Sequence, residues 1–205
     1  MHKFFKRSDI RLSQRTKLHS LEAQMRFFPH AGKITLMASS KSEIRIAHTL
    51  ARPHSSSGLT NQLEQLVRKL NPKLIASYVP YSTEPDISGF NNAHAERVVL
   101  PRVVGEKLEF ASGELIRGSF GILEPQGPAI NPGLIELIFV PALAADSSGN
   151  RLGKGKGFYD RFLANLNCPK VAVVFASELI QGLEIEEHDQ RVDFVVTPET
   201  TIEVI

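Results

Sequence analysis

The chain has 205 residues, of which 42% are hydrophobic and 22% are charged, and this ordinary globular composition excludes an intrinsically disordered protein. Its 24 basic and 22 acidic residues leave a net charge of +2, which argues against a broad nucleic-acid surface. Cys168 is the single cysteine, so a disulfide within the chain is impossible, as is usual in a reducing cytosol.

Nothing in the sequence resembles a membrane segment or a secretory signal. The longest apolar run, residues 134–145, contains Glu136 and Pro141 and is too short to cross a bilayer. The first residues, MHKFFKRSDIR, lack the apolar centre of a signal peptide. We therefore expect a cytoplasmic protein with no membrane partner and no nucleic-acid partner.

The first 70 residues carry mainly helical patterns. Apolar residues recur at helical spacing over residues 8–28, after two possible capping residues. Residues 34–38 are either a short strand or a break in this helical region, and a helix-like pattern follows over residues 47–51. Residues 52–58 have the composition of a loop, and residues 63–70 mark a further amphipathic helix.

The second half of the chain carries five apolar runs, and these are typical of strands. They are residues 74–79, 97–101, 134–142, 170–176 and 192–197. Continuous runs of this kind predict strands buried on both faces, as in a parallel sheet covered by helices. The sequence therefore predicts a three-layer, Rossmann-like α/β architecture with a mainly parallel central sheet. We expect one domain over residues 1–205, with a helical N-terminal segment over about residues 1–70.

Two segments connect the predicted strands. Phe158, Phe162 and Leu166 are spaced four apart and predict a helix, so that strand, loop, helix and strand form a βαβ unit. Residues 105–133 are rich in glycine and proline, and we interpret them as a turn-rich excursion that includes a short antiparallel ribbon.

The stretch GNRLGKGKGFYDRFL, residues 149–163, is the most unusual part of the sequence. Its alternating glycines and lysines lie between a predicted strand and a predicted helix, where open α/β sheets bind ligands. Glycine backbone, lysine charge and a helix N-terminus all favour a phosphate or a carboxylate. The alternative is a basic surface turn, since the spacing is neither that of a P-loop nor that of a dinucleotide-binding fingerprint.

Several acidic residues allow two interpretations. Asp160 in the first helical turn either complements the helix dipole or binds a Mg²⁺ ion that bridges nucleotide phosphates. Glu186 and Glu187 are interpreted as a solvated acidic turn, and Glu84 lies in a segment typical of a polar loop. His188 has no serine or cysteine partner in the sequence that would indicate a hydrolytic triad.

Four motifs together resemble the 5-formyltetrahydrofolate cyclo-ligase family. RLGKGKGFYDRFL resembles its signature R-L-G-x-G-[GK]-G-[FY]-Y-D-R, and VPALAADSSGNRLG, FGILEP and HDQRVDFVVTPE resemble further motifs in the same order. Residues 78–86 are similar to the substrate loop after the first strand. The resemblance covers residues 74–199 well and the N-terminal segment loosely.

This resemblance implies a three-layer α/β fold and an enzyme that uses ATP and Mg²⁺. The implied reaction converts 5-formyltetrahydrofolate into 5,10-methenyltetrahydrofolate and releases ADP and phosphate. In it, the formyl oxygen attacks the γ-phosphate of ATP, N10 then attacks the activated carbon, and phosphate leaves. The implied partner is the small-molecule folate, and we expect a monomer.

The resemblance also assigns residues. The ATP loop would consist of Arg151, Leu152, Gly153, Lys154, Gly155, Lys156, Gly157, Phe158 and Tyr159. Residues 154–158 would also face the folate, and Lys154, Lys156 and Tyr159 would be catalytic. Val79 and Glu84 would contact the folate, and Asp160 and Asp189 would be ligands of Mg²⁺.

The chain departs from the family pattern in two places. The family has a Lys-x-x-x-Arg motif near its N-terminus, with the lysine on ATP and the arginine on the substrate. Arg7 and Arg11 have this spacing here, so both are expected to bind ATP and Arg11 also the folate, with Arg7 where a lysine is usual. Ala145 stands where the family usually has phenylalanine, which indicates a packing change near the loop.

Three alternative functions stay open at the level of sequence. A related protein that keeps the nucleotide loop could act on another substrate or lack folate activity. A non-enzymatic module could hold nucleic acid, although the positive charge is local and acids flank it. An isomerase or CoA-transferase on a similar fold would need a base or carboxylate nucleophile, which the sequence does not clearly supply.

Overall fold

A computed structural model describes residues 40–53, 55–118 and 121–204 of the chain. These residues belong to one compact unit that spans residues 36–205. The predictions for residues 8–28, residues 34–38, Arg7 and Arg11 lie outside the described residues, and they stay predictions.

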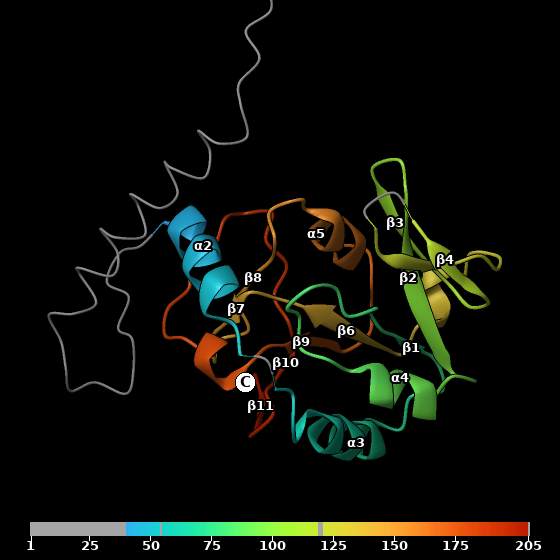
Figure 1. The fold of residues 1–205 in the computed structure, drawn as a ribbon, viewed down its shortest axis with the longest axis horizontal. Coiled ribbons are helices and arrows are strands. Elements are labelled where there is room, and N and C mark those ends of the chain that lie inside the picture. The colour runs from blue at the N-terminus through green and yellow to red at the C-terminus, as the bar shows by residue number, and fades with distance from the viewer. Residues whose placement is uncertain (1–39, 54, 119–120, 205) are drawn as a thin grey trace, which may run out of the picture. The chain divides into compact units, whose positions relative to one another are not determined.

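The centre of the unit is a seven-stranded sheet with the strand order β11-β10-β9-β6-β1-β2-β3 (Figure 1). Its parallel strands are β1 (Ile75–Ala76), β2 (Val98–Val104), β6 (Leu137–Pro141), β9 (Lys170–Val173) and β10 (Phe194–Val196). The edge strands β3 (Lys107–Ala111) and β11 (Thr201–Glu203) pair antiparallel. All five strands predicted from the apolar runs are present, and the prediction of a mainly parallel sheet is confirmed.

The remaining elements are short. The helices are α2 (Lys41–Ala51), α3 (Leu59–Leu70), α4 (Ser88–Ala93) and α5 (Phe158–Leu163), with the 3₁₀ turns η1 (Pro132–Leu134) and η2 (Ala176–Glu178). Two ribbons stand apart from the central sheet, β4 (Leu115–Arg117) with β5 (Leu123–Pro125) and β7 (Ala144–Ala145) with β8 (Arg151–Leu152). No helix within the described ranges is long and apolar enough to cross a membrane.

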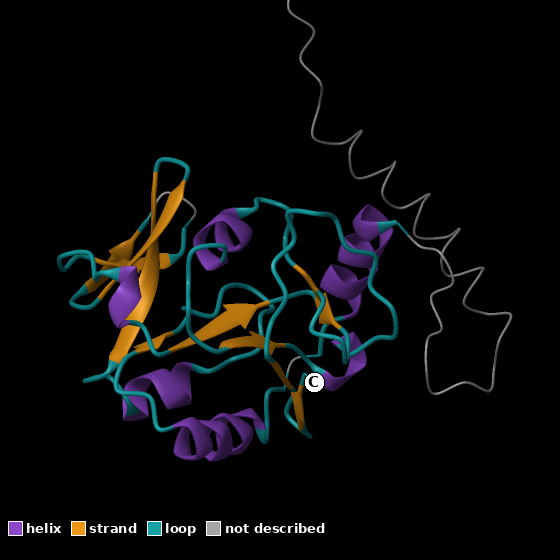
Figure 2. Cartoon of the chain, turned by 180° about the vertical axis from the view of Figure 1, so that it is seen from behind, coloured by secondary structure: helices purple, strands orange, loops and turns teal. Residues whose placement is uncertain are grey.

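Strand β6 shows why the unit has three layers. Its side chains alternate between the two faces of the sheet, as the pleat requires. Leu137 and Phe139 belong to the apolar core under α3 and α4, whereas Ile138 and Val140 pack with Leu163 of α5. In Figure 1, α3 and α4 lie below the sheet and α5 lies above it, and the view from behind in Figure 2 shows the same layers.

Helix α2 is present, but its buried face differs from the prediction. Leu50, which the helical pattern placed among the apolar positions, is 63% exposed. The buried residues are Ile44 and His48, one turn apart, and Ile44 packs against Leu152 of the β7–β8 ribbon. Ser40 and Glu43 form a capping box that begins the helix.

The connection between β6 and the glycine–lysine loop (residues 151–157) contains the β7–β8 ribbon, which was not predicted. Ala145, in place of the usual phenylalanine, is completely buried in this ribbon and forms a bridge with Leu179. Helix α5 ends at Leu163, before the predicted core residue Leu166, which is nevertheless buried. The antiparallel ribbon expected within residues 105–133 is present as β4 and β5.

Candidate active site

A cavity of about 950 Å³ contains every predicted site residue that the structure describes. It lies where β1 and β6 end, since Val79 follows β1 and Pro141 is the last residue of β6. Its lining includes the predicted residues Val79, Glu84, Arg151, Leu152, Gly153, Lys154, Gly155, Lys156, Gly157, Phe158, Tyr159, Asp160 and Asp189. Segments far apart in the sequence therefore meet at this cavity.

The glycine–lysine loop has a backbone that only glycine adopts easily. Gly155 has φ +86° and Gly157 has φ +66°, both in the left-handed region. Gly157 also directly precedes α5 and is its N-cap. On the opposite side, Arg45 of α2 donates a hydrogen bond from Nε to the carbonyl oxygen of Gly153 at 2.9 Å, and its guanidinium lies beside Gly155. The loop is thus held by α2 while its interior faces the cavity.

Lys154 joins the loop to the segment after β1. Its Nζ lies 2.6 Å from Oε1 of Glu84 and 5.4 Å from the centre of the Tyr81 ring. The Glu84 side chain is 8% exposed, and its Oε2 accepts a hydrogen bond from the backbone nitrogen of Tyr81 at 2.9 Å. The carboxylate that was predicted to contact the folate and the lysine that was predicted to be catalytic are therefore adjacent.

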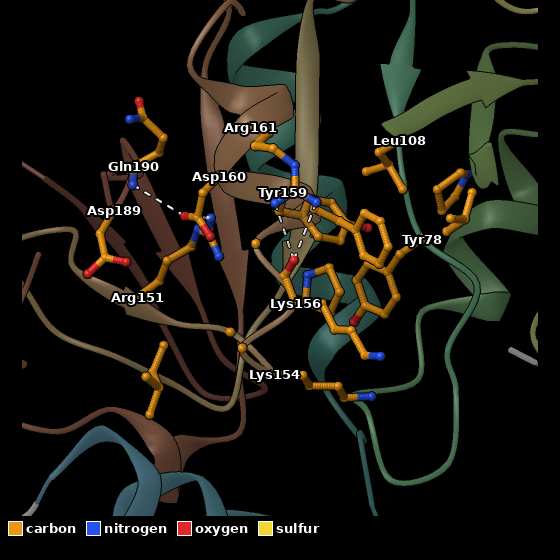
Figure 3. Close-up of a pocket in the computed structure, with 18 of the residues that line it drawn as sticks. Tyr78, Leu108, Arg151, Lys154, Lys156, Tyr159, Asp160, Arg161, Asp189 and Gln190 are labelled. Carbon is orange, nitrogen blue, oxygen red and sulfur yellow. Dashed lines mark hydrogen bonds and ion pairs between the residues drawn. The ribbon is translucent and has the colours of Figure 1, made fainter. Parts of the chain in front are cut away.

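Arg161 holds the loop from the side of the β2–β3 hairpin. Its Nη1 and Nη2 each donate to the carbonyl oxygen of Lys156 at 3.4 Å, as the dashed lines in Figure 3 show. Nη2 also donates to the carbonyl oxygen of Glu106, in the turn between β2 and β3, at 3.1 Å. One guanidinium thereby connects the glycine–lysine loop with the neighbouring hairpin.

The predicted metal ligand Asp160 lies at the other end of the cavity, paired with Arg151. Nη2 of Arg151 is 2.6 Å from Oδ1 of Asp160, which also accepts a hydrogen bond from the backbone nitrogen of Gln190 at 3.3 Å. The Arg151 side chain is 3% exposed, and burial lowers the pKa of its guanidinium despite the nearby Asp160 charge. Its Nε is buried without a hydrogen-bond partner among the described residues.

Asp189, the second predicted metal ligand, is paired with Lys41 of α2. Nζ of Lys41 lies 2.5 Å from Oδ2 of Asp189 and 2.9 Å from Oε1 of Glu186. The Glu186 side chain is 58% exposed, as expected for a solvated acidic turn, and it also lines the cavity. Burial raises the pKa of Asp189, but hydrogen bonds from Lys41 and from the Glu186 backbone lower it more, so the pKa lies below its usual value.

Tyr78 and Tyr159 form the apolar side of the cavity with Leu108. This side lies opposite the Asp160 and Asp189 carboxylates in Figure 3. Burial, and then the charge of Glu84, raise the pKa of Tyr159 well above its usual value. Burial likewise raises the pKa of Tyr78, whose hydroxyl donates to the carbonyl oxygen of Pro85 at 2.7 Å. Tyr159 is therefore a neutral phenol at physiological pH, suited to donate a hydrogen bond and unsuited to act as a base.

The acidic side of the cavity suits a metal ion that binds together with substrate phosphates. Within the described ranges, no three histidine, cysteine, aspartate or glutamate side chains gather into a metal site. Asp160 and Asp189 instead line the same cavity, and the backbone nitrogen of Gln190, the next residue after Asp189, donates to Asp160. Mg²⁺ usually takes one or two carboxylates from a protein when substrate phosphates supply further oxygens. The unpaired Nε of the buried Arg151 is a donor that a phosphate oxygen would satisfy.

Lys41 and Arg45 both line the cavity, although neither was predicted from the sequence as a site residue. A signal was available, because KSEIR, residues 41–45, carries the Lys-x-x-x-Arg spacing without the arginine-for-lysine departure of Arg7 and Arg11. Arg161 is the last residue of the family signature, but its role could not be predicted from the sequence. Its backbone acceptor Glu106 lies in a hairpin that only the fold places beside it.

The chain is similar to known proteins of one family. A model of the 5-formyltetrahydrofolate cyclo-ligase family matches residues 29–198. The 5-formyltetrahydrofolate cyclo-ligase of Mycolicibacterium smegmatis is 34% identical over 151 residues, which are 65% of this chain and 78% of that protein. The mouse enzyme of the same name is 36% identical over 74 residues, which are 33% of this chain and 36% of that protein.

Solved structures of similar proteins share the fold. The NMR structure of Aquifex aeolicus 5,10-methenyltetrahydrofolate synthetase has a TM-score of 0.70 and 29% identity, and the match covers 80% of this chain and 92% of that one. The Mycoplasma pneumoniae 5,10-methenyltetrahydrofolate synthetase, at 22% identity and a TM-score of 0.62, covers 78% of this chain and 99% of that one and supports the fold alone. With a family match that includes every predicted site residue of the described part, the chain belongs to the 5-formyltetrahydrofolate cyclo-ligase family.

Proposed function

We propose that this chain converts 5-formyltetrahydrofolate and ATP into 5,10-methenyltetrahydrofolate, ADP and phosphate, in a reaction that depends on Mg²⁺. The observation that carries the proposal is the arrangement of one cavity around one loop. Lys154 of the glycine–lysine loop contacts Glu84 on the apolar side, and Arg151 at the start of the same loop contacts Asp160 on the acidic side. A folate and a triphosphate bound at these two sides would meet at the loop.

The loop residues would then stabilise the negative charge that is redistributed during phosphoryl transfer. Lys154 and Lys156 would stabilise the γ-phosphoryl group while it is attacked by the formyl oxygen of the folate, and the backbone from Gly153 to Gly157 would surround the phosphates. Tyr159, a neutral phenol, would donate a hydrogen bond to an oxygen that gains negative charge. Bound Mg²⁺ would neutralise phosphate charge, and Asp160 and Asp189 would hold it.

Lys41 and Arg45 are the residues that we assign to the family's Lys-x-x-x-Arg motif. Their side chains line the cavity, and Arg45 already contacts the glycine–lysine loop. Lys41 would contact an ATP phosphate and Arg45 the folate. Arg7 and Arg11 have the same spacing and stay an alternative for these two roles. The cytoplasmic location, the monomeric state and the absence of a nucleic-acid partner also stay predictions.

Absorbance of the methenyl product in the near ultraviolet tests the proposal. Purified protein with 5-formyltetrahydrofolate should give rising absorbance with Mg·ATP and a flat trace without it. Asp160→Asn should lower kcat/KM by about tenfold or more, because it removes one carboxylate from the metal. A flat trace from folded wild-type protein that binds ATP would contradict the folate assignment and favour a relative that acts on another substrate.

A further inference from the structure

Both predicted metal ligands are already paired with cations that belong to the chain. Asp160 is held by Arg151 at 2.6 Å, and Asp189 is held by Lys41 at 2.5 Å. A bare divalent ion that approached these carboxylates would therefore meet two positive side chains. Repulsion between such like charges is strong where solvent screening is weak.

The two cations differ in how firmly they are placed. The Arg151 side chain is 3% exposed, and Arg151 is part of strand β8, so the guanidinium has little freedom to move. Lys41 is the first residue of α2, its side chain is 15% exposed, and its ammonium group is carried by a flexible chain. Lys41 is therefore the cation that can exchange partners.

We propose that Lys41 is the resident counter-ion of Asp189, and that it disfavours the binding of a bare divalent metal until a nucleotide phosphate draws the ammonium group away. This inference rests on the proposed function, since it takes Mg·ATP as the ligand of the acidic side. The metal and the nucleotide then bind with positive coupling, and each raises the affinity for the other by the same factor.

Asp189 keeps its orientation when Lys41 leaves. The backbone nitrogen of Glu186 donates to Oδ2 of Asp189 at 2.8 Å, independently of Lys41. Glu186 accepts the same ammonium group at 2.9 Å, and His188 lies 3.6 Å from Glu186 on the exposed side. Removing the positive charge of residue 41 should therefore leave the carboxylates in place for a metal ion, with more negative charge around it.

Binding of Mn²⁺ alone to the full chain, measured by electron paramagnetic resonance without nucleotide, tests the proposal. Lys41→Met should bind Mn²⁺ about fivefold more tightly than wild type or better, which is the lower end of typical coupling between sites. A non-hydrolysable ATP analogue should then raise Mn²⁺ affinity less in Lys41→Met than in wild type. Lys69→Met is the matched control, because Lys69 pairs with Glu203 at 2.6 Å on the exposed surface, and it should leave Mn²⁺ affinity unchanged.

Two further variants separate charge from shape. Lys41→Arg keeps the charge and should bind Mn²⁺ as wild type does, and Asp189→Asn added to Lys41→Met should remove the gain. Unchanged or weaker Mn²⁺ binding by folded Lys41→Met would overturn the proposal, as would a gain that survives Asp189→Asn. Product absorbance is measured separately. Turnover by wild type without tighter Mn²⁺ binding by Lys41→Met rejects only the counter-ion role of Lys41. Tighter Mn²⁺ binding by Lys41→Met without turnover by wild type rejects the proposed function.

Discussion

Gly157 and Gly182 have nearly the same backbone conformation in different surroundings. Their φ values are +66° and +67°, so an alanine at either position costs about 1 kcal/mol of backbone strain. A Cβ atom on Gly157 would lie 2.8 Å from Nη1 of Arg161, whereas nothing lies within 4 Å of one on Gly182. Gly157→Ala would therefore also displace the guanidinium that holds the loop.

Enzyme kinetics separate the backbone strain, which both variants share, from the displacement of Arg161, which only Gly157→Ala causes. We expect Gly157→Ala to raise the KM for ATP and lower kcat, together about tenfold or more in kcat/KM, since misplacing a loop by a fraction of an ångström is costly in catalysis. Gly182→Ala should lose similar stability in urea denaturation and keep its kcat/KM. Equal kinetic losses in both variants would contradict a specific role for the loop conformation.

At the scale of elements, a buried ion pair fixes the end of α2. Arg52, the C-cap of this helix, donates from Nε to Oε1 of Glu178 at 2.6 Å, and both side chains are 1% exposed. Its Nη2 also donates to the carbonyl oxygen of Ala142, just after β6, and Glu178 accepts from the backbone nitrogen of Phe175. The pair thus connects α2, which carries Lys41 and Arg45, to two segments that follow central strands.

Removing one partner should be costly. Arg52→Met leaves Glu178 buried without its cation, and we expect a loss of about 3–5 kcal/mol in the free energy of unfolding, measured by urea denaturation. The double variant Arg52→Met with Glu178→Met should lose clearly less than the sum of the single losses. Additive losses would contradict direct coupling between the two side chains.

The loss should also depend on pH. Burial raises the pKa of Glu178 above its value of 4.5 in an exposed chain, even though the hydrogen bond from Arg52 lowers it. Without Arg52 the folded pKa rises further, so the folded state holds its proton more tightly than the unfolded state does. In Arg52→Met, the stabilisation that comes from this bound proton is fully present below about pH 4.5 and is lost as the pH rises through the folded pKa of Glu178. The deficit of Arg52→Met in the free energy of unfolding should therefore be smaller at about pH 5 than at about pH 8.

For the whole molecule, the central sheet was predictable and the contacts around the cavity were less so. Runs such as residues 170–176 are apolar on both faces, and only a covered parallel sheet buries them completely. The lengths of β1, β6, β9 and β10 were overestimated, because apolar residues such as Tyr78 stay buried after the ladder ends, whereas β2 is longer than predicted. The β7–β8 ribbon was missed, since two-residue strands leave no periodic pattern to detect.

In the candidate site, too, one part was predictable from the sequence and another part was not. The loop residues 151–160 are contiguous, so a motif could identify them together. Lys41 reaches Asp189 across 148 residues of sequence, and Arg45 reaches Gly153 across 108. Such contacts depend on how α2 packs against the β7–β8 ribbon, which the local pattern of α2 did not reveal because its buried face is narrow.

In the proposed reaction, a folate bound at one side of the cavity presents its formyl oxygen to the γ-phosphate of an ATP bound at the other side. An oxygen-18 label placed in the formyl group of 5-formyltetrahydrofolate, with phosphate analysed by mass spectrometry, tests this transfer. If the formyl oxygen is phosphorylated and then leaves with the phosphate, the label appears in inorganic phosphate in step with the methenyl product. Unlabelled phosphate from a reaction that forms the methenyl product would contradict the account.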